Sequence, residues 1–316
     1  MPVKPYISIC IPVYNSENTI AELVRQIKKN LDSSCRLEFI LVNDCSRDQS
    51  EKICTELSRN YKNVVFISLR KNFGEHNAVM CALNHAGGEY AVIIDDDFQN
   101  PPEEIIKLVR EAQKGWDVVY SKYNIKKHNI LRNIGSAFND KVFNWLIGKP
   151  RHLYLSSFKV INKEVVNEII KYKGPFPYID GLIFRITRNV ASVAVEHHDR
   201  KAGVSNYTFS KLVSLWLAMF VNFSIKPLRL AVFFGFFTAF CGFFSSFFLV
   251  FRQIFFHIND IPGWLSLYTA TLLFSGLQLI FLGLLGEYTG KIYLDQNGTP
   301  QWVIKKTCNY KQRKAA

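Results

Sequence analysis

The chain has 316 residues, of which 48% are hydrophobic and 21% are charged, so its composition is that of a folded protein and not of a disordered one. Lysine and arginine outnumber aspartate and glutamate by 39 to 26, and the net charge of +13 suits a partner that carries negative charge. No nucleic-acid-binding motif accompanies this charge, so we expect no nucleic acid and instead an anionic membrane surface. The seven cysteines form no CxxC pair, which favours a reducing compartment and argues against a structural zinc or disulfide framework.

The first part of the chain alternates short apolar runs with amphipathic stretches. The apolar runs predict strands at residues 6–11, 37–42, 64–69, 90–94 and 118–120. The stretches between them predict helices at residues 20–31, 50–59, 77–86 and 102–114. Because strands and helices alternate, we expect right-handed crossovers and a mostly parallel sheet with helices on both faces. Ligands of such sheets bind at the carboxyl ends of the strands, which are followed here by PVYN, NDCS, RKNFG and DDDFQNPP.

The middle of the chain continues this mixture of strands and helices. Apolar residues at helical spacing predict a helix over residues 130–147. SSFKVI predicts a strand, and a helix is predicted to begin near Lys163. The segment YIDGLIFRI comes next, and VASVAVEHHDR then alternates polar and apolar residues enough to predict another strand. Residues 208–222 mix large apolar side chains with one lysine, which favours a helix lying on a membrane surface.

Two later runs, residues 230–251 and 261–286, contain no charged residue. At about 1.5 Å per residue, each is longer as a helix than the ~30 Å hydrocarbon core of a bilayer. Buried core helices would favour shorter runs with a polar stripe, so we predict two membrane-spanning helices. Basic residues flank the pair, and the positive-inside rule then places both termini and the large N-terminal domain in the cytoplasm. We expect no signal peptide, because MPVKPYISIC leads directly into a strand.

Three adjacent carboxylates, Asp95, Asp96 and Asp97, follow the predicted strand at residues 90–94. Because side chains alternate along an extended chain, Asp95 and Asp97 point the same way, with Gln99 nearby. Oxygen ligands of this kind suit Mg²⁺ or Mn²⁺ held together with the phosphates of a substrate. The alternative is a solvated acidic turn that caps the next helix. The position at the carboxyl end of a strand favours the metal site.

Asp44 and Tyr14 also follow predicted strands. The Asp44 carboxylate is suited to accept hydrogen bonds from a nucleobase, and the Tyr14 ring is suited to stack on it. A helix N-cap is the alternative role for Asp44, although Ser46 or Asp48 could take it. The chain contains no GxGxxG, no P-loop motif and no HExxH, which removes the main support for dinucleotide, P-loop and zinc-protease sites.

The order of IPVYN, VNDCS and IDDDFQNPPE resembles that of family 2 glycosyltransferases. More narrowly, RKNFGEHNA, DVVYSK, RKAGVSNY and GEYTGKIY resemble the polyprenyl-phosphate glycosyltransferases. That group includes dolichyl-phosphate mannose synthases and bacterial undecaprenyl-phosphate sugar transferases with a two-helix C-terminal membrane anchor. The resemblance extends to about residue 303. It implies an α/β fold of the GT-A type, which binds nucleotide-diphospho-sugars, and relatives of this kind form tetramers.

The resemblance also implies site residues. The metal ligands fall on Asp95, Asp97 and Gln99. The nucleotide-sugar contacts fall on Pro12, Tyr14, Asn15, Asp44, Asp95, Asp96 and Lys122. The contacts to an acceptor phosphate fall on Arg200 and Lys122, and the charge of Arg132 makes it a further candidate for them. The catalytic residues are Asp97, Arg200 and Asp180.

The chain departs from the family pattern at a few positions. Ser16 stands where the family often has a glutamate, and Lys122 replaces an arginine, which keeps the charge but loses bidentate geometry. The QxxRW signature of processive family 2 synthases is absent, which favours transfer of a single sugar.

The expected chemistry needs no general base. A phosphate monoester on a lipid has a second pKa near ~6, so it is largely dianionic at pH 7. Such a nucleophile needs cations that position it, and direct displacement at the anomeric carbon then inverts the sugar's configuration. Asp180 lies where other family 2 enzymes place a catalytic base. We expect it instead to orient the sugar or a basic residue, with the base as the alternative.

These inferences predict four parts: a GT-A domain at residues 1–207, an interfacial helix at 208–226, a transmembrane hairpin at 227–288 and a cytoplasmic basic tail at 289–316. The expected activity is inverting transfer of one sugar from a nucleotide-diphosphate sugar, with a UDP-sugar favoured, to polyprenyl phosphate. It would occur at the cytoplasmic face of the inner or plasma membrane, for cell-envelope glycans, with a homo-oligomer expected by resemblance. The alternatives are another lipid acceptor, or a catalytically inactive membrane scaffold that binds a nucleotide sugar.

Overall fold

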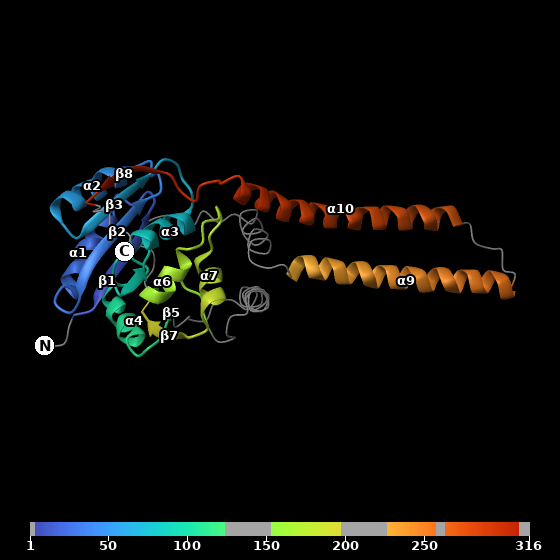
Figure 1. Cartoon of the computed structure of the whole chain (residues 1–316), viewed down its shortest axis with the longest axis horizontal. Helices are drawn as coiled ribbons and strands as arrows, with labels where there is room; N and C mark the ends of the chain where they lie inside the picture. The colour runs from blue at the N-terminus through green and yellow to red at the C-terminus, as the bar shows by residue number, and fades with distance from the viewer. Residues whose placement is uncertain (1–3, 124–152, 197–225, 257–262, 310–316) are drawn as a thin grey trace. The chain divides into compact units, whose positions relative to one another are not determined.

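The computed structural model describes residues 4–123, 153–196, 226–256 and 263–309 (Figure 1). These residues group into two units. The first unit contains residues 4–123, 153–196 and 298–309 and holds a β-sheet, whereas the second contains residues 226–256 and 263–297 and is helical. The chain therefore leaves the sheet unit, forms the helical unit and then returns to the sheet.

The sheet unit is built on one sheet, which has eight strands among the described residues, in the order β7-β5-β6-β4-β1-β2-β3-β8. The strands are β1 (Tyr6–Val13), β2 (Arg36–Asn43), β3 (Val64–Leu69), β4 (Tyr90–Ile93), β5 (Val118–Tyr123), β6 (Lys159–Asn162), β7 (Val190–Val195) and β8 (Ile304–Cys308). β1 pairs in parallel with β2 and β4, β2 with β3, and β5 with β7. β6 runs antiparallel to β4 and β5, and β8 runs antiparallel to β3. The predicted mostly parallel sheet is confirmed.

Helices cover both faces of this sheet (Figure 1). One core cluster contains side chains of α1 (Ile20–Leu31), α2 (Ser50–Asn60) and α4 (Ile105–Ala112). The cluster on the other face contains side chains of α3 (Glu75–His85), α6 (Lys163–Ile169) and α7 (Ile179–Ile186). Along β1, Ile9 and Ile11 enter the first cluster and Cys10 the second, as the two-residue period of a strand requires.

Most predicted elements agree closely with the structure. The helix at residues 20–31 and the strand at 64–69 match α1 and β3. The helix predicted at 102–114 divides, because a 3₁₀ turn, η1 (Pro102–Glu104), precedes α4. The helices predicted at 130–147 and 208–222 lie outside the described residues.

The segment that follows the helical unit adds an edge strand, β8, that the sequence did not predict. Gln301 precedes it and is buried, and its Nε2 donates to the carbonyl oxygens of Tyr172 and Gly174 at 3.1 and 2.6 Å. Part of the basic tail expected at residues 289–316 is therefore a strand of the sheet. The segment IKKTC is short and polar on its exposed face, so it lacks the apolar run by which the other strands were found.

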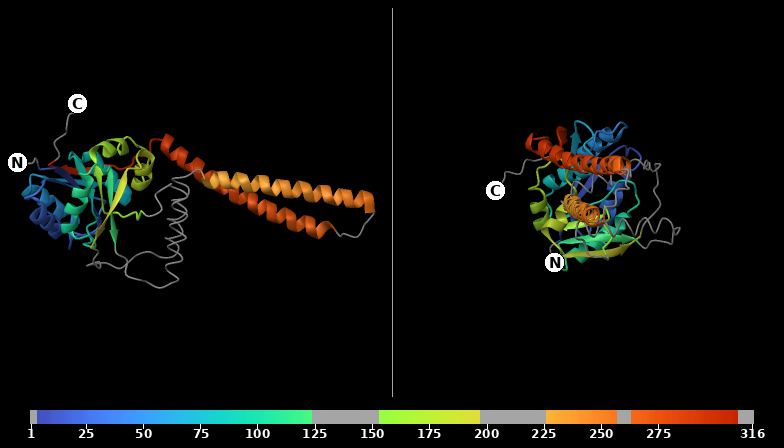
Figure 2. Two further views of the ribbon diagram at one scale, coloured as in Figure 1. Left: turned by 90° about the horizontal axis from the view of Figure 1, so that it is seen from below. Right: turned by 90° about the vertical axis from the view of Figure 1, so that its right-hand side faces the viewer.

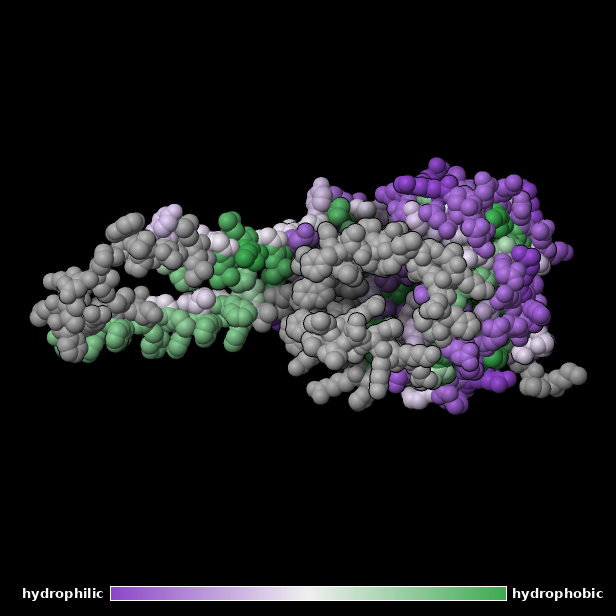
Figure 3. Space-filling model, turned by 180° about the vertical axis from the view of Figure 1, so that it is seen from behind, coloured by the Kyte–Doolittle hydropathy of each residue, from purple (hydrophilic) through white to green (hydrophobic). Residues whose placement is uncertain are grey.

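The helical unit contains α9 (Lys226–Phe256) and α10 (Gly263–Gln296), which lie side by side in two views (Figures 1 and 2). Hydrophobic side chains gather on this unit, whereas hydrophilic side chains predominate on the sheet unit (Figure 3). On α9, Phe233, Phe236 and Phe243 are 65%, 74% and 68% exposed. Within the part of the chain that the structure describes, no helix combines the length and the apolar character that crossing a membrane requires. The two membrane-spanning helices predicted within residues 227–288 are therefore not confirmed.

Candidate functional site

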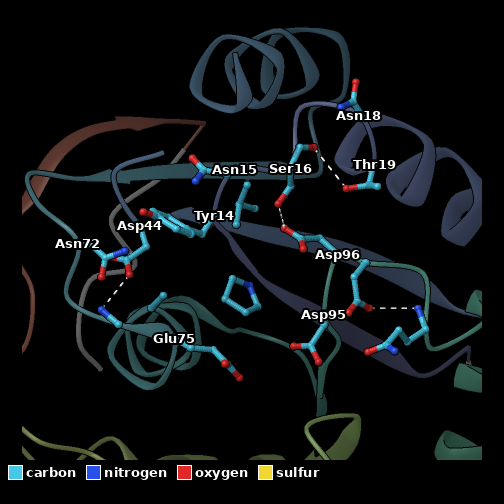
Figure 4. A pocket seen from close by; sticks show the side chains of 16 residues that line it. Tyr14, Asn15, Ser16, Asn18, Thr19, Asp44, Asn72, Glu75, Asp95 and Asp96 are labelled. Carbon is cyan, nitrogen blue, oxygen red and sulfur yellow. Dashed lines mark hydrogen bonds between the residues drawn. The ribbon is translucent and has the colours of Figure 1, made fainter. Parts of the chain in front are cut away.

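A pocket of about 840 Å³ lies where β1, β2 and β4 end (Figure 4). Tyr14 and Asp44 lie on one side of it, and Asp95 and Asp96 lie on the other. Parallel α/β sheets bind ligands at this edge, because the loops that follow neighbouring strands converge there. The lining residues are Pro12, Val13, Tyr14, Asn15, Ser16, Asn18, Thr19, Asp44, Asn72, Gly74, Glu75, Ala78, Asp95, Asp96, Asp97 and Gln99.

The loops after β1 and β2 are joined by hydrogen bonds between side chains and backbone. The Asn15 N–H donates to Ser46 Oγ at 3.0 Å, and the Arg47 N–H donates to Asn15 Oδ1 at 2.9 Å. Glu17 accepts from the Gln49 N–H at 2.8 Å. Asn15 has a φ of 55°, a left-handed conformation that asparagine tolerates better than most residues. Asn15 therefore holds the frame of the pocket as well as lining it.

The two carboxylate oxygens of Asp44 both accept hydrogen bonds from the backbone. The Phe73 N–H donates to Oδ1 at 2.7 Å and the Gly74 N–H donates to Oδ2 at 2.8 Å. Burial raises the pKa of Asp44, and these two bonds act in the opposite direction. A carboxylate has about four acceptor sites, so Asp44 keeps capacity for a nucleobase. It does not cap α2, where Asp48 accepts from the Ser50 N–H at 3.0 Å.

The three adjacent aspartates are each held by a neighbouring donor. Phe98, directly after them, has a φ of 61° and turns the chain sharply. The pKa of Asp96 is raised to about 7: burial is the largest cause, the hydrogen bond from Ser16 acts to lower it, and the charges of Asp95 and Asp97 act to raise it. Ser16, which replaces the family's glutamate, thus contacts the acidic motif directly. The donors are Ser157 Oγ to Asp95, Ser16 Oγ to Asp96, and the Gln99 N–H to Asp97.

The donor set at these aspartates fits a divalent cation bound together with a substrate. Among the described residues, no three His, Cys, Asp or Glu side chains are grouped so as to hold a metal ion by themselves. Mg²⁺ is often bound by only one or two carboxylates, with substrate phosphates and water completing its shell. A cation there would also relieve the repulsion that raises the pKa of Asp96. Asp95, Asp97 and Gln99 are the residues that would hold it.

Asp180 forms a buried ion pair with Lys159 and does not line the pocket. Lys159 Nζ and Tyr120 Oη both donate to Asp180 Oδ1, the second at 2.9 Å. Lys159 Nζ also lies 5.0 Å from the centroid of the Tyr120 ring. Burial, and then the charge of Asp180, raises the pKa of Tyr120, so this hydroxyl stays protonated and donates. These contacts favour an orienting role for Asp180 over a catalytic base.

The structure brings most of the predicted site residues together and leaves others apart. Lys122 is exposed on β5 and does not line the pocket. Arg132 and Arg200 lie outside the described residues, so the predicted contacts with an acceptor phosphate stay predictions, as do the individual roles of the pocket residues. The predicted residues that share the pocket are Pro12, Tyr14, Asn15, Asp44, Asp95, Asp96, Asp97 and Gln99.

Glu75, Asn72 and Asn18 line the pocket but were not predicted as site residues. Glu75 is exposed to solvent there, yet protein surrounds it on most sides. Burial and then the charge of Asp95 raise its pKa to about 7, while the charge of Lys159 acts to lower it. A signal for Glu75 exists in the sequence, because RKNFGE follows a strand at the same edge of the sheet.

Relatives of this chain extend along almost its whole length. It is 32% identical over 309 residues to the undecaprenyl-phosphate 4-deoxy-4-formamido-L-arabinose transferase of Proteus mirabilis, covering 97% of this chain and 95% of that protein. It is 29% identical over 302 residues to the uncharacterized glycosyltransferase YkcC of Bacillus subtilis, covering 95% of this chain and 93% of that protein.

Among solved structures, the fold is similar to glucosyl-3-phosphoglycerate synthase from Mycobacterium tuberculosis in complex with Mn²⁺ and UDP-glucose. The TM-score is 0.52 at 18% identity, covering 69% of this chain and 77% of that one, a likeness that shows the fold alone. The predicted α/β fold of the GT-A type is thereby confirmed. The family model described as Glycosyl transferase family 2 matches residues 8–170. Together with the relatives above, this match shows that the chain belongs to glycosyl transferase family 2.

Proposed function

We propose that the protein transfers one sugar from a nucleotide-diphosphate sugar to a polyprenyl phosphate, with a UDP-sugar as the favoured donor and undecaprenyl phosphate as the favoured acceptor. The observation that carries the donor half is the pocket in which Tyr14, Asp44 and three adjacent aspartates face one cavity. The acceptor half is supported by relatives whose names describe undecaprenyl-phosphate sugar transfer, at 32% identity for the Proteus mirabilis protein.

The two sides of the pocket suit the two ends of a nucleoside diphosphate. Tyr14 is 46% exposed as a residue, so a nucleobase that stacks on its ring removes apolar surface from water. Asp44 retains acceptor sites for N–H groups of the same base. The diphosphate would lie toward Asp95 and Asp97, where a cation compensates its charge.

The transfer itself is a direct displacement. An oxygen of the dianionic lipid phosphate forms a bond to the anomeric carbon as the bond from that carbon to the nucleoside diphosphate breaks, and the configuration inverts. No proton has to be removed from the dianion at neutral pH, so Asp180 is free for its orienting contacts with Lys159. A divalent cation bound there would supply Lewis-acid stabilisation of the departing diphosphate. Arg200, Arg132 and Lys122 are proposed to receive the acceptor phosphate.

We also propose that the helical unit associates with the lipid bilayer and that transfer occurs at the cytoplasmic face of the inner membrane. Two charge-free runs of sequence, residues 230–251 and 261–286, support this proposal. The phenylalanines exposed along α9 support it as well, since a surface of this kind avoids water. Assembly into a homo-oligomer is an expectation from resemblance.

The proposed reaction is tested by incubating the detergent-solubilised full chain with radiolabelled nucleotide sugars and undecaprenyl phosphate, with Mg²⁺, Mn²⁺ or EDTA. We expect a chloroform-soluble, acid-labile product that EDTA abolishes. Asp97→Asn should lose it, because the substitution removes a charged metal ligand. Asp32→Asn is the matched control, because Asp32 forms an exposed ion pair with Lys28 on the surface of the sheet unit. If the chain binds nucleotide sugars but forms no lipid product, undecaprenyl phosphate is not the acceptor. The remaining functions are then transfer to another lipid or an inactive scaffold.

A further inference from the structure

Glu75 stands at the pocket on a backbone that is held by other residues. It is the first residue of α3 and follows Gly74, whose φ of 92° is rarely adopted by residues with side chains. Asp44 accepts from the N–H groups of Phe73 and Gly74 at 2.7 and 2.8 Å, and Asn77 Nδ2 donates to the Phe73 carbonyl oxygen at 2.8 Å. The position of the Glu75 backbone is therefore held by contacts that its own side chain does not make.

The Glu75 carboxylate makes no hydrogen bond and no ion pair within the part of the chain that is described. It differs in this from Asp95, Asp96 and Asp97, each of which accepts a hydrogen bond from a neighbouring group. A carboxylate kept beside like charges without a partner costs free energy. Among the described residues, no contact of the Glu75 side chain gives a reason for an acidic group at this position, and a ligand is the alternative.

Figure 4 shows that Glu75 extends from α3 away from Tyr14 and toward the side of the pocket that holds Asp95. A nucleotide sugar whose base lies at Tyr14 and whose diphosphate lies near Asp95 carries its sugar beyond the diphosphate. The sugar then comes to the side of the pocket toward which Glu75 extends.

We infer that Glu75 selects the sugar of the donor, an inference that rests on the proposed function. An ionised carboxylate only accepts hydrogen bonds, so it favours a sugar that presents hydroxyl or amino groups to it. It disfavours a sugar that carries a carboxylate of its own, because three aspartates already share the pocket. The substrate class is therefore a neutral or amino sugar and not a uronic acid.

The test compares dissociation constants of the full chain for UDP, UDP-glucose and UDP-glucuronate with Mn²⁺ at pH 8, where the Glu75 carboxylate is ionised. The variants are Glu75→Gln, which keeps the shape but not the charge, and Glu75→Asp, which keeps the charge. Glu22→Gln is the control, because Glu22 lies on the exposed surface of α1 beside Arg25.

We expect the unchanged chain and the control to bind UDP-glucose about 10-fold more tightly than UDP-glucuronate, as charge-assisted hydrogen bonds and like-charge repulsion allow. Glu75→Gln should abolish most of this preference and leave the dissociation constant for UDP within about twofold. Glu75→Asp should keep the bias against UDP-glucuronate.

Two results would overturn the inference and leave the donor half of the proposed function standing. One is that Glu75→Gln still binds UDP-glucose more tightly than UDP-glucuronate, by the same factor as the unchanged chain. The other is a loss of UDP affinity in that variant equal to its loss of UDP-glucose affinity, which would indicate a distorted pocket. If the unchanged chain binds neither UDP nor a UDP-sugar in the presence of metal, the proposed function fails and the inference fails with it.

Discussion

Replacement of Asp180 by asparagine should destabilise the sheet unit, because it leaves the charge of Lys159 buried. Lys159 is 3% exposed and Asp180 is 7% exposed, and the two form an ion pair. Loss of one partner of a buried pair costs about 3–5 kcal/mol, since the remaining charge is uncompensated. The nearby charge of Glu75 still attracts Lys159, so the lower end applies, about 3 kcal/mol. At roughly 2–4 °C per kcal/mol for a unit of this size, the Tm falls by about 6–12 °C.

The measurement is thermal unfolding of the purified full chain, followed by circular dichroism, together with the rate of sugar transfer at low temperature. Adding Lys159→Met to Asp180→Asn should recover most of the lost Tm, because it removes the unpaired buried charge of Lys159. The asparagine at position 180 still accepts a hydrogen bond from Tyr120. The result that would refute this reasoning is an Asp180→Asn variant that unfolds within about 2 °C of the parent yet transfers no sugar. That outcome would assign Asp180 the role of catalytic base.

Two further predictions concern the packing of the sheet unit and its stability in acid. Gly88→Ala should lower the urea midpoint of unfolding, because the added Cβ would lie 2.7 Å from two backbone atoms of β1. Gly276→Ala is the control and should leave the midpoint unchanged, because the space around Gly276 is open. Equal midpoints for the two variants would contradict the crowding at Gly88. Asp48→Asn should flatten the acid side of the pH profile of Tm. Burial raises the pKa of Asp48, but hydrogen bonds from Ser50 and Glu17 outweigh burial and lower it. The contribution of Asp48 to stability is therefore complete above about pH 4 and is lost as the pH falls through the lowered pKa of Asp48. Profiles of Tm that run parallel for variant and parent between about pH 6 and about pH 2.5 would refute the role of these hydrogen bonds.

The sheet and its covering helices could be predicted because their pattern is local. A strand buried on both faces, such as β2, appears as a continuous apolar run, and α1 shows its buried stripe at helical spacing. The strands' carboxyl ends then indicated where polar residues would meet, and Asp44 and Asp95 do line one pocket. β8 escaped prediction because it has few apolar residues and gains its place only by pairing with β3.

The chemistry of the individual side chains depended on contacts between segments far apart in the chain. Asp44 was predicted to serve a ligand, and the structure adds that it positions the start of α3, 30 residues further on. Asp180 was placed by resemblance, but it lies on α7 while its partner Lys159 lies on β6, and no spacing in the sequence indicates the pair. Glu75 follows a strand at the edge of the sheet where ligands bind, but only the folded structure shows that its side chain extends toward the side of the pocket that holds Asp95. Periodicity reports which face of an element is buried, whereas the partner of a charge is set by how elements pack, and that is a property of the folded chain.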